Sequence, residues 1–241
     1  MSVTIRYRDA WEGFWRGAPE EPGSVIWDAD PTLTAERHLA LFHPHLADPQ
    51  LPVVDLGCGN GTLTRFLTGR FARVVGVDLS EAALDLARRH DPARRAEFAL
   101  LDATDAEAVR ALHDRLGDAN VYVRGLIHQS EPADRLPVAE AVAALVGGRG
   151  RAFVVELSQA AKQVLADLAQ GPGGPPPKLR PVFAHGLAPA EVADAAFPAL
   201  FDAAGLTVLA SGDLPLATTE SAPDGGRIEL PAQWLVVGVP E

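Results

Sequence analysis

A glycine-rich turn between an apolar run and an amphipathic segment constrains the fold of this 241-residue chain most strongly. The stretch reads Leu51-Pro-Val-Val-Asp-Leu-Gly-Cys-Gly-Asn-Gly-Thr-Leu-Thr-Arg-Phe-Leu67. Residues 53–56 favour a buried strand, the three alternating glycines favour a tight turn, and residues 62–69 favour a helix. This order of strand, tight loop and helix is how α/β proteins bring their backbone close to a nucleotide-like ligand.

The next hundred residues repeat the alternation of strand and helix. Short runs rich in β-branched residues alternate with stretches rich in Ala, Leu and Arg. This alternation is typical of a parallel sheet with crossover helices. Ser80 is the expected N-cap of the second helix, and Gly147-Gly148 is the expected stop of the fourth. We predict strands at residues 53–56, 73–78, 96–101, 120–124 and 151–156, and helices at residues 62–69, 81–90, 105–117 and 134–146.

The C-terminal part predicts an antiparallel addition to this sheet. After Pro189, a helix through Phe201 and Gly205 leads to an expected strand at residues 206–210. A polar stretch containing Pro and Gly then precedes a strand at residues 233–239, with no helix between the two. Strands that are joined without a crossover helix favour antiparallel pairing. We therefore expect the last strand of a mostly parallel sheet to be antiparallel.

Two segments lie outside the predicted strands and helices of the core. The first 50 residues contain Trp11 and Trp15, which share one helical face and either dock the helix onto the core or cover a ligand. Gln170-Gly-Pro-Gly-Gly-Pro-Pro-Pro-Lys178 cannot be helical inside, because its prolines lack the backbone donor. It is either a substrate-side lid or a disordered connector. We expect a helical cap over residues 1–50 and a core over residues 51–241, with residues 157–188 as a lid insertion.

Charge and composition restrict the classes of partner. The net charge of −11 argues against broad contact with nucleic acid, which calls for clustered Lys and Arg. The single cysteine, Cys58, leaves no internal disulfide and no cysteine-based zinc cage. His38, His43 and His45 lack a nearby carboxylate pattern, so we expect no metal site there. No apolar run approaches the roughly 20 residues of a membrane helix, and the first residues are polar, so we expect no membrane contact and a cytoplasmic location.

The spacing of the glycines separates one class of cofactor from another. A dinucleotide fold requires the pattern G-x-G-x-x-G, whereas here Thr62 occupies the third position and the glycines come sooner. The glycine spacing therefore argues against a site for the pyrophosphate of a dinucleotide. The next strand, Val74-Val-Gly-Val-Asp78, ends in an acid that is placed to accept hydrogen bonds from ribose hydroxyls. Its charge would repel a 2′-phosphate, so NADP is disfavoured.

These motifs resemble those of class I S-adenosylmethionine (SAM) methyltransferases. Val54-Asp-Leu-Gly-Cys-Gly-Asn-Gly61 followed by Gly76-Val-Asp-Leu-Ser80 is similar to motif I and the second-strand motif of that family. The resemblance covers about residues 51–156, and the two late strands fit the closing antiparallel pair of the family. It implies an α/β fold, a three-layer sandwich around a seven-stranded, mostly parallel Rossmann-like sheet.

The resemblance also implies which residues hold SAM. Asp55 and the glycine loop would hold the methionine part, Asp78 the ribose, and Leu79 one face of the adenine. Leu101-Asp-Ala103 matches the position whose acid meets the adenine amino group. Asp102 is the candidate there, with a surface turn as the alternative. The further implied cofactor residues are Gly57, Cys58, Gly59, Asn60, Gly61 and Ala103.

The fourth strand and the N-terminal segment add two more candidates. Many relatives carry an acid in or beside the fourth strand, whereas this chain reads Asn120-Val-Tyr-Val-Arg124. Arg124 would face the methionine carboxylate or the substrate, and a cation there pairs with a carboxylate of either. Trp11-Glu-Gly-Phe-Trp15, with Trp27 downstream, is similar to the start of thiopurine-type methyltransferases. That similarity implies that Trp11 or Trp15 shields the sulfonium.

Methyl transfer from a sulfonium is an in-line displacement that depends chiefly on alignment in a dry pocket. A base is required when the nucleophile must lose a proton. His128, after the fourth strand, is a candidate base or a structural residue, and His185, after the proline-rich segment, is a candidate base or a polar loop residue. Glu156, at the end of the fifth strand, either lines the pocket, caps a helix or faces solvent. We do not expect Cys58 to act as a nucleophile, because no histidine is paired with it.

The leading prediction is a SAM-dependent methyltransferase that acts on a small molecule. The composition, rich in Ala, Arg, Gly and Pro, favours by analogy an acceptor from secondary metabolism. One alternative is a fold that binds SAM without methyl transfer, either a pericyclase-like enzyme or a ligand-binding partner protein. A second alternative is an NAD-dependent oxidoreductase. The sequence leaves the oligomeric state open, with a homodimer as one possibility.

Overall fold

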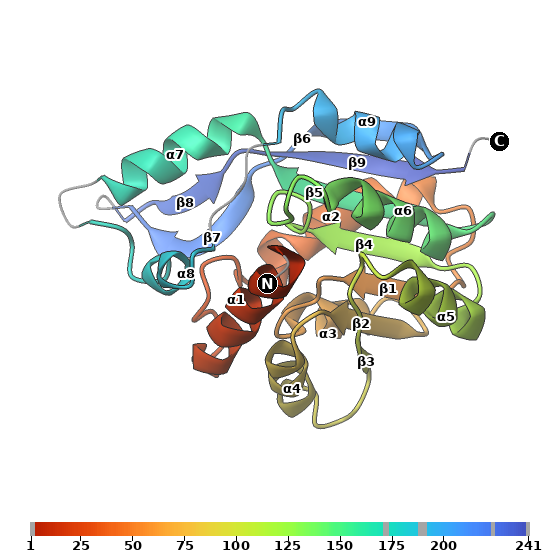
Figure 1. The fold of residues 1–241 in the computed structure, drawn as a ribbon, viewed down its shortest axis with the longest axis horizontal. Helices are drawn as coiled ribbons and strands as arrows, with labels where there is room; N and C mark the ends of the chain where they lie inside the picture. The colour runs from red at the N-terminus through yellow and green to blue at the C-terminus, as the bar shows by residue number, and fades with distance from the viewer. Residues whose placement is uncertain (1–2, 171–173, 188–191, 223–224, 240–241) are drawn as a thin grey trace.

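The sheet at the centre of the protein has seven strands. The computed structural model describes residues 3–170, 174–187, 192–222 and 225–239. The order across the sheet is β3-β2-β1-β4-β5-β9-β6 (Figure 1). The strands are β1 (Val53–Leu56), β2 (Val74–Asp78), β3 (Glu97–Leu100), β4 (Asn120–Arg124), β5 (Arg151–Leu157), β6 (Thr207–Asp213) and β9 (Ala232–Gly238).

The register confirms a mostly parallel sheet with an antiparallel strand. β1 pairs in parallel with β2 and β4, and β4 pairs in parallel with β5. β9 lies between β5 and β6 and is antiparallel to both. All five of the first predicted strands start and end within one residue of the observed bounds. β6 extends to Asp213, three residues beyond its predicted end.

Helices cover both faces of the sheet, which gives the expected three layers. Val54 and Val154 point to the face covered by α5 (Ala106–Leu116), α6 (Arg135–Val146) and α9 (Ala196–Ala203). Val53 and Phe153, one residue earlier on the same strands, point to the opposite face, because successive side chains alternate. α2 (Ala35–Phe42) and α3 (Thr62–Leu67) pack there, and α4 (Glu81–His90) packs beside β2 and β3.

The N-terminal helix α1 (Val3–Gly17) is fixed to the start of α4. Ser80 caps α4 as predicted, because its hydroxyl accepts a hydrogen bond from the Ala83 N–H at 3.1 Å. The carboxylate of Glu12 in α1 accepts hydrogen bonds from the Ser80 hydroxyl at 2.7 Å and the Ala82 N–H at 3.1 Å. A carboxylate at a helix N-terminus also interacts favourably with the helix dipole. α1 is thereby held beside the carboxyl ends of the parallel strands. Two 3-10 helices flank α2, η1 (Pro31–Leu33) and η2 (His43–His45).

A hairpin that the sequence did not predict contacts the segment that follows α1. It consists of β7 (Leu216–Ser221) and β8 (Arg227–Leu230), within the stretch read as polar and irregular. Figure 1 shows this hairpin together with α7 (Gln159–Ala169) and α8 (Arg180–Ala184) at one end of the molecule. The Thr219 N–H donates to the Ile26 carbonyl at 2.8 Å, and the Lys178 ammonium donates to the Thr219 carbonyl at 3.1 Å. These contacts are tertiary, which is why a local pattern did not reveal them.

Parts of two predicted segments lie outside the described residues. Residues 171–173 of the proline-rich segment are among them, as are residues 188–191 before the predicted helix that contains Phe201. The described part of that helix is α9, and it ends at Ala203. Within the described ranges, no helix is both long enough and apolar enough to cross a bilayer.

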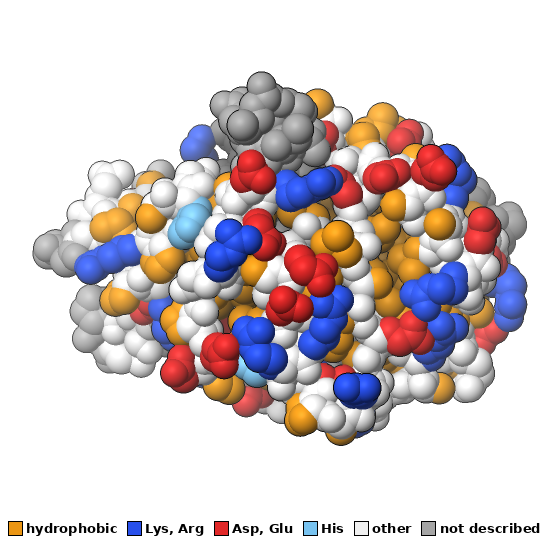
Figure 2. Space-filling view, turned by 60° about the horizontal axis from the view of Figure 1, so that its bottom comes forward, with side chains coloured by type: hydrophobic (Ala, Val, Ile, Leu, Met, Phe, Trp, Pro, Cys, Tyr) orange, Lys and Arg blue, Asp and Glu red, His pale blue; other side chains and the backbone are white. Residues whose placement is uncertain are grey.

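Charged side chains of both signs are interspersed on the face drawn in Figure 2. Ion pairs at the surface of the protein join Glu97 to Arg73 at 2.9 Å and to Arg115 at 2.7 Å. Exposed pairs of this kind contribute little to stability, because solvent screens them. The face in Figure 2 therefore carries mixed charge and no continuous basic area.

Candidate functional site

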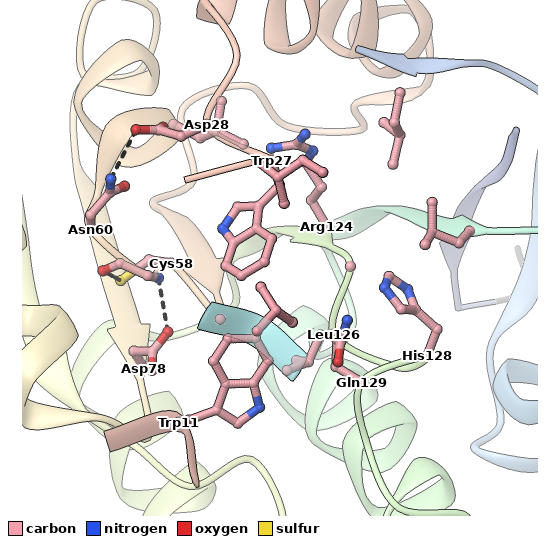
Figure 3. Close-up of a pocket in the computed structure, with 18 of the residues that line it drawn as sticks. Trp11, Trp27, Asp28, Cys58, Asn60, Asp78, Arg124, Leu126, His128 and Gln129 are labelled. Atoms are coloured by element: carbon pink, nitrogen blue, oxygen red, sulfur yellow. Dashed lines mark hydrogen bonds between the residues drawn. The ribbon is translucent and has the colours of Figure 1, made fainter. Parts of the chain in front are cut away.

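A single pocket joins the carboxyl ends of the central strands to α1, α7, α8 and the β7–β8 hairpin. Its lining includes the glycine loop, the ends of β2 and β4, and the aromatic residues of the N-terminal segment. Figure 3 shows Cys58, Asn60 and Asp78 on one side and His128 on the other, with the indoles of Trp11 and Trp27 between them. Of the fifteen predicted site residues, these twelve line it: Trp11, Trp15, Asp55, Gly57, Cys58, Gly59, Asn60, Asp78, Leu79, Ala103, Arg124 and His128.

The glycine loop is shaped by two close approaches. Gly59 has φ of +53°, and a Cβ atom there would lie 2.8 Å from the Trp15 ring. Gly61 has φ of +71°, and a Cβ atom there would lie 2.9 Å from both the Ala87 methyl group and the Phe98 ring. Only glycine tolerates both demands at little cost. Gly59 thus brings backbone to the pocket, whereas Gly61, at the start of α3, packs against α4 and β3 and does not line the pocket.

Two buried carboxylates end β1 and β2. Asp55 accepts a hydrogen bond from the Thr64 hydroxyl at 2.6 Å, and burial raises the pKa of Asp55 to about 7 in spite of that bond. Asp78 accepts hydrogen bonds from the N–H groups of Ser80 at 3.0 Å and Gly59 at 2.8 Å. Burial raises the pKa of Asp78 as well, and these backbone bonds oppose the rise. The pocket therefore presents two acids whose negative charge a bound cation or hydroxyl would stabilise.

Arg124 is the one cationic Lys or Arg side chain among the described lining residues. Burial lowers the pKa of its guanidinium, whereas the nearby Tyr122, Asp28 and Asp55 oppose that shift. Its Nε atom is buried and has no hydrogen-bond partner in the described part of the chain. An unpaired guanidinium in this position fits a carboxylate of a ligand.

An aromatic group from the N-terminal segment covers the pocket. The Trp11 and Trp27 rings meet edge to face at 5.8 Å between centroids, and Trp15 and Trp27 do so at 6.2 Å. Tyr7 packs edge to face on Trp11 at 6.2 Å. Asp28, next to Trp27, accepts a hydrogen bond from the Asn60 amide at 3.0 Å and so ties this segment to the glycine loop (Figure 3). The Trp11–Trp15 helical face therefore docks the helix and lines the pocket at once.

His128 and Glu156 form a buried pair at the ends of β4 and β5. The His128 Nδ1 atom lies 2.5 Å from the Glu156 Oε2 atom, and the two residues are 6% and 2% exposed. Glu156 also accepts hydrogen bonds from three backbone N–H groups, of Leu126 and Ile127 at 2.9 Å and of His128 at 3.0 Å. A carboxylate that accepts four bonds is fully satisfied and fixes the ring by its Nδ1 atom. The Nε2 atom is left for the pocket.

Three predicted site residues do not line the pocket. His185 is exposed, packs against Phe14 with ring centroids 6.1 Å apart, and hydrogen-bonds through Nδ1 to the Pro181 carbonyl at 2.9 Å. The Asp102 carboxylate is engaged by the Arg8 guanidinium at 2.6 Å and by the Thr104 N–H and hydroxyl. Although partial burial raises the pKa of Asp102, these bonds bring it below its usual value. Gly61 is the third, for the packing reason given above.

Sequence reasoning missed several residues of the pocket. Tyr7, Asp28 and Gln129 line it, although none of the three was named as a candidate from the sequence. Tyr7 lies one turn before Trp11 on the same face of α1, so the helical period was a usable signal. Another part of the wall comes from α7 and α8, which lie within the predicted lid segment 157–188, and from the hairpin, which no local pattern connected to the site. Among the described residues, no group of three or more His, Cys, Asp or Glu side chains is placed to hold a metal ion.

Comparison with known proteins agrees with this geometry. Residues 53–150 match a family model described as a methyltransferase domain. A ubiquinone biosynthesis O-methyltransferase of Thiobacillus denitrificans is 36% identical over 115 residues, 47% of this chain and 47% of that protein. The chain thus spans about half the length of the curated relatives it matches.

Two solved structures extend the comparison to the whole chain. A SAM-dependent methyltransferase of Anabaena variabilis is 30% identical with a TM-score of 0.89, and the match covers 97% of this chain and 95% of that one. A Burkholderia thailandensis 1,6-didemethyltoxoflavin-N1-methyltransferase, solved with that compound and S-adenosylhomocysteine, is 18% identical with a TM-score of 0.64. That match covers 100% of this chain and 92% of the other, and it concerns the fold alone.

The strand order, the glycine loop after β1 and the acid that ends β2 define a Rossmann-like methyltransferase fold. Because the 30% identity extends over nearly the whole chain, the protein belongs to the class I SAM-dependent methyltransferases. The residues present fit SAM, the cofactor of that family. The loop approaches the pocket through glycine backbone, two acids end the neighbouring strands, and the unpartnered Arg124 Nε supplies a cation for a carboxylate.

Proposed function

We propose that the protein transfers the methyl group of SAM to a hydroxyl oxygen of a small-molecule acceptor, with His128 as the general base. The observation that carries this proposal is the buried His128–Glu156 pair at the edge of the pocket. A histidine oriented by a carboxylate is typical of general bases, and a hydroxyl acceptor must lose a proton during transfer. The names of the Thiobacillus denitrificans relative and the next relatives, all O-methyltransferases, support oxygen as the accepting atom.

The chain holds SAM through residues on one side of the pocket in this proposal. Asp78 accepts hydrogen bonds from the ribose hydroxyls, and Leu79 packs on the adenine beside Ala103. Asp55 pairs with the methionine ammonium, and Arg124 pairs with the methionine carboxylate. The Asp102 carboxylate is already engaged by Arg8 and Thr104. In this proposal Asp102 therefore acts by shaping the turn that it belongs to.

The proton path follows from the bonds that Glu156 makes. With every other bond to Glu156 coming from a backbone N–H, the Nδ1 atom of His128 donates as well, and the Nε2 lone pair is free. When bound, SAM supplies an electrophilic methyl group on a sulfonium. His128 Nε2 would take the hydroxyl proton as the acceptor oxygen received the methyl group, with S-adenosylhomocysteine as the other product. Glu156 stabilises the imidazolium that results.

The aromatic residues keep this site dry. Trp11 and Trp15 each pack edge to face on Trp27, and the Trp15 ring lies against Gly59 of the glycine loop. Excluding water strengthens the interaction between His128 and Glu156 and holds donor and acceptor in line. The net charge of −11, together with the mixed charge on the face drawn in Figure 2, supports a small molecule rather than a polyanion as the acceptor. An acceptor from secondary metabolism, a cytoplasmic location and a homodimer stay predictions.

A panel experiment tests the proposal. The protein is incubated with SAM and a set of phenols, alcohols, amines and thiols, and S-adenosylhomocysteine and methylated product are quantified by mass spectrometry. We expect methyl ethers, and a fall of roughly 10²–10⁴ in rate for His128→Gln with unchanged SAM affinity. SAM binding by calorimetry without product across the panel would instead support the non-methylating alternative. Full activity in His128→Gln would refute the assignment of His128 as the general base.

A further inference from the structure

The part of the pocket that is lined by residues after position 156 has apolar walls. We call it the outer chamber and define it by Leu157, Leu165, Val182, Phe183, Leu216 and Leu230. These residues come from the end of β5, α7, α8 and the β7–β8 hairpin. The chamber and the proposed base belong to one pocket, because His128 lines that pocket together with all six residues. All six positions lie after residue 150, outside the segment that matches the methyltransferase domain model.

The outer chamber offers no charge to a ligand. No described residue after position 156 that lines the pocket carries a charged side chain. The one hydroxyl among them belongs to Thr218, and it already donates a hydrogen bond to the Ile228 carbonyl at 2.7 Å. The carboxylates Asp55 and Asp78 lie at the ends of β1 and β2, on the cofactor side. A charged group placed in the chamber would lose its hydration without a partner, which is costly.

Near His128 the pocket has the opposite character. The Tyr7 hydroxyl and the Gln129 Oε1 atom are buried and have no hydrogen-bond partner among the described residues, and both residues line the pocket. Gln129 follows His128 in the chain, and Figure 3 shows it beside Leu126 and below His128. Buried polar groups are normally hydrogen-bonded, so unpaired ones at a pocket wall indicate a polar ligand group.

We propose that the acceptor is an amphipathic hydroxyl compound with an uncharged apolar tail. Its polar head lies at His128 and pairs with Tyr7 and Gln129, and its tail fills the outer chamber. This inference rests on the proposed function for the assignment of the head. The tail site stands on the chamber alone, so binding tests it separately from methyl transfer.

The binding experiment uses para-alkylphenols with tails of increasing length, from para-cresol to para-pentylphenol. Their affinities for the S-adenosylhomocysteine-loaded protein are measured by calorimetry. Each added methylene should lower Kd about fourfold, because it moves from water into an apolar site. The same tails ending in a carboxylate should bind at least about tenfold more weakly than the uncharged ones. Affinity that is independent of tail length, or a preference for the charged tail, would overturn the proposal.

A positive charge introduced into the chamber should raise the affinity for an acidic tail, a result that misfolding cannot produce. Leu165 lies on the partly exposed helix α7, so Leu165→Lys is placed to be tolerated. This variant should bind the carboxylate-ended tails more tightly than the wild type does, and the alkyl tails more weakly. Leu209→Lys, at a 37% exposed position on β6 outside the pocket, is the matched control and should leave both series unchanged.

The two hypotheses fail in different ways. Chain-length-dependent binding without S-adenosylhomocysteine production from SAM would refute methyl transfer to these hydroxyls and leave the tail site intact. Methyl transfer with a kcat/KM that is independent of tail length would refute the tail site and leave methyl transfer to a hydroxyl intact. If Leu165→Lys and Leu209→Lys change affinity equally, the chamber is not where the tail binds.

Discussion

Replacing Glu156 by glutamine tests how the proposed base is oriented. The carboxylate accepts four hydrogen bonds, two at Oε1 from the N–H groups of Leu126 and Ile127, and two at Oε2 from the N–H and Nδ1 of His128. A glutamine has one carbonyl oxygen and one NH₂ group. Its oxygen should stay with Leu126 and Ile127, whose hydrogens cannot move. Its NH₂ group then faces His128, whose ring adapts by accepting at Nδ1 and carrying its proton on Nε2.

The cost of Glu156→Gln follows from these bonds. The backbone N–H of His128 loses its acceptor, which costs about 1.5–3 kcal/mol for a buried bond to a charged group. The bonds from Leu126 and Ile127 change from a charged to a neutral acceptor and weaken by about 1 kcal/mol each. The free energy of unfolding should therefore fall by about 3–5 kcal/mol. At about 2–4 °C per kcal/mol for a chain of this length, the Tm should fall by roughly 6–20 °C.

Three measurements follow the substitution. Thermal denaturation gives the Tm, and long-range ¹H–¹⁵N correlation spectra of histidine-labelled protein give the tautomer of His128 at mildly alkaline pH. The wild type should carry the proton on Nδ1 and the variant on Nε2, with a methyl-transfer rate lowered by roughly 10²–10⁴. Glu140→Gln, at an exposed position on α6, is the control and should stay within about 0.5 kcal/mol. A wild-type proton on Nε2, or an unchanged tautomer and rate in Glu156→Gln, would refute the reasoning.

Three further predictions concern the cofactor side. Asp78→Ala should weaken SAM binding by at least about 1–3 kcal/mol, because ribose hydroxyls lose a buried acceptor, and unchanged calorimetric affinity would remove Asp78 from the site. The pKa of Asp55 is raised to about 7 by burial, so its carboxyl is protonated below that pH. SAM affinity should rise as pH increases through 7, while the ligand-free protein loses stability between about pH 4 and 7, because the unfolded chain releases the Asp55 proton in this range and the folded chain retains it. Asp55→Asn should flatten both profiles, and persistent pH dependence in that variant would assign the effect elsewhere. Gly59→Ala should lower stability by about 1–2 kcal/mol for its positive φ alone, and should displace Trp15, which near-UV circular dichroism would register.

The sequence predicted the fold well where local signals and long-range pairing agree. β1 and β4 were predicted with their observed bounds, because short apolar runs between turn signals describe buried parallel strands. The β7–β8 hairpin was missed, because the prolines and glycines around it are typical of loops, and its place depends on Thr219 bonding to Ile26. The extension of β6 was missed for a similar reason, since only its pairing with β9 defines it.

The residues of the site show the same difference between local signals and long-range contacts. The glycine loop and Asp78 were located from spacing, because backbone conformation and the end of a strand are local properties. His128 was one of two histidines that the sequence left undecided. The structure brings His128 to the pocket with Glu156 and places His185 on the outer side against Phe14. That choice depends on the ends of two strands meeting, which no local pattern contains.

The sequence by itself determined a glycine loop between strand and helix, an acid at the end of the next strand, and the family to which both belong. These features are written in short stretches where side-chain period and glycine conformation decide the structure. Only the tertiary structure decided what surrounds the loop. It packed Trp15 on Gly59, paired His128 with Glu156, and closed the pocket with apolar residues from α7, α8 and the hairpin. These contacts join residues far apart in the chain, so they exist only once the sheet has assembled.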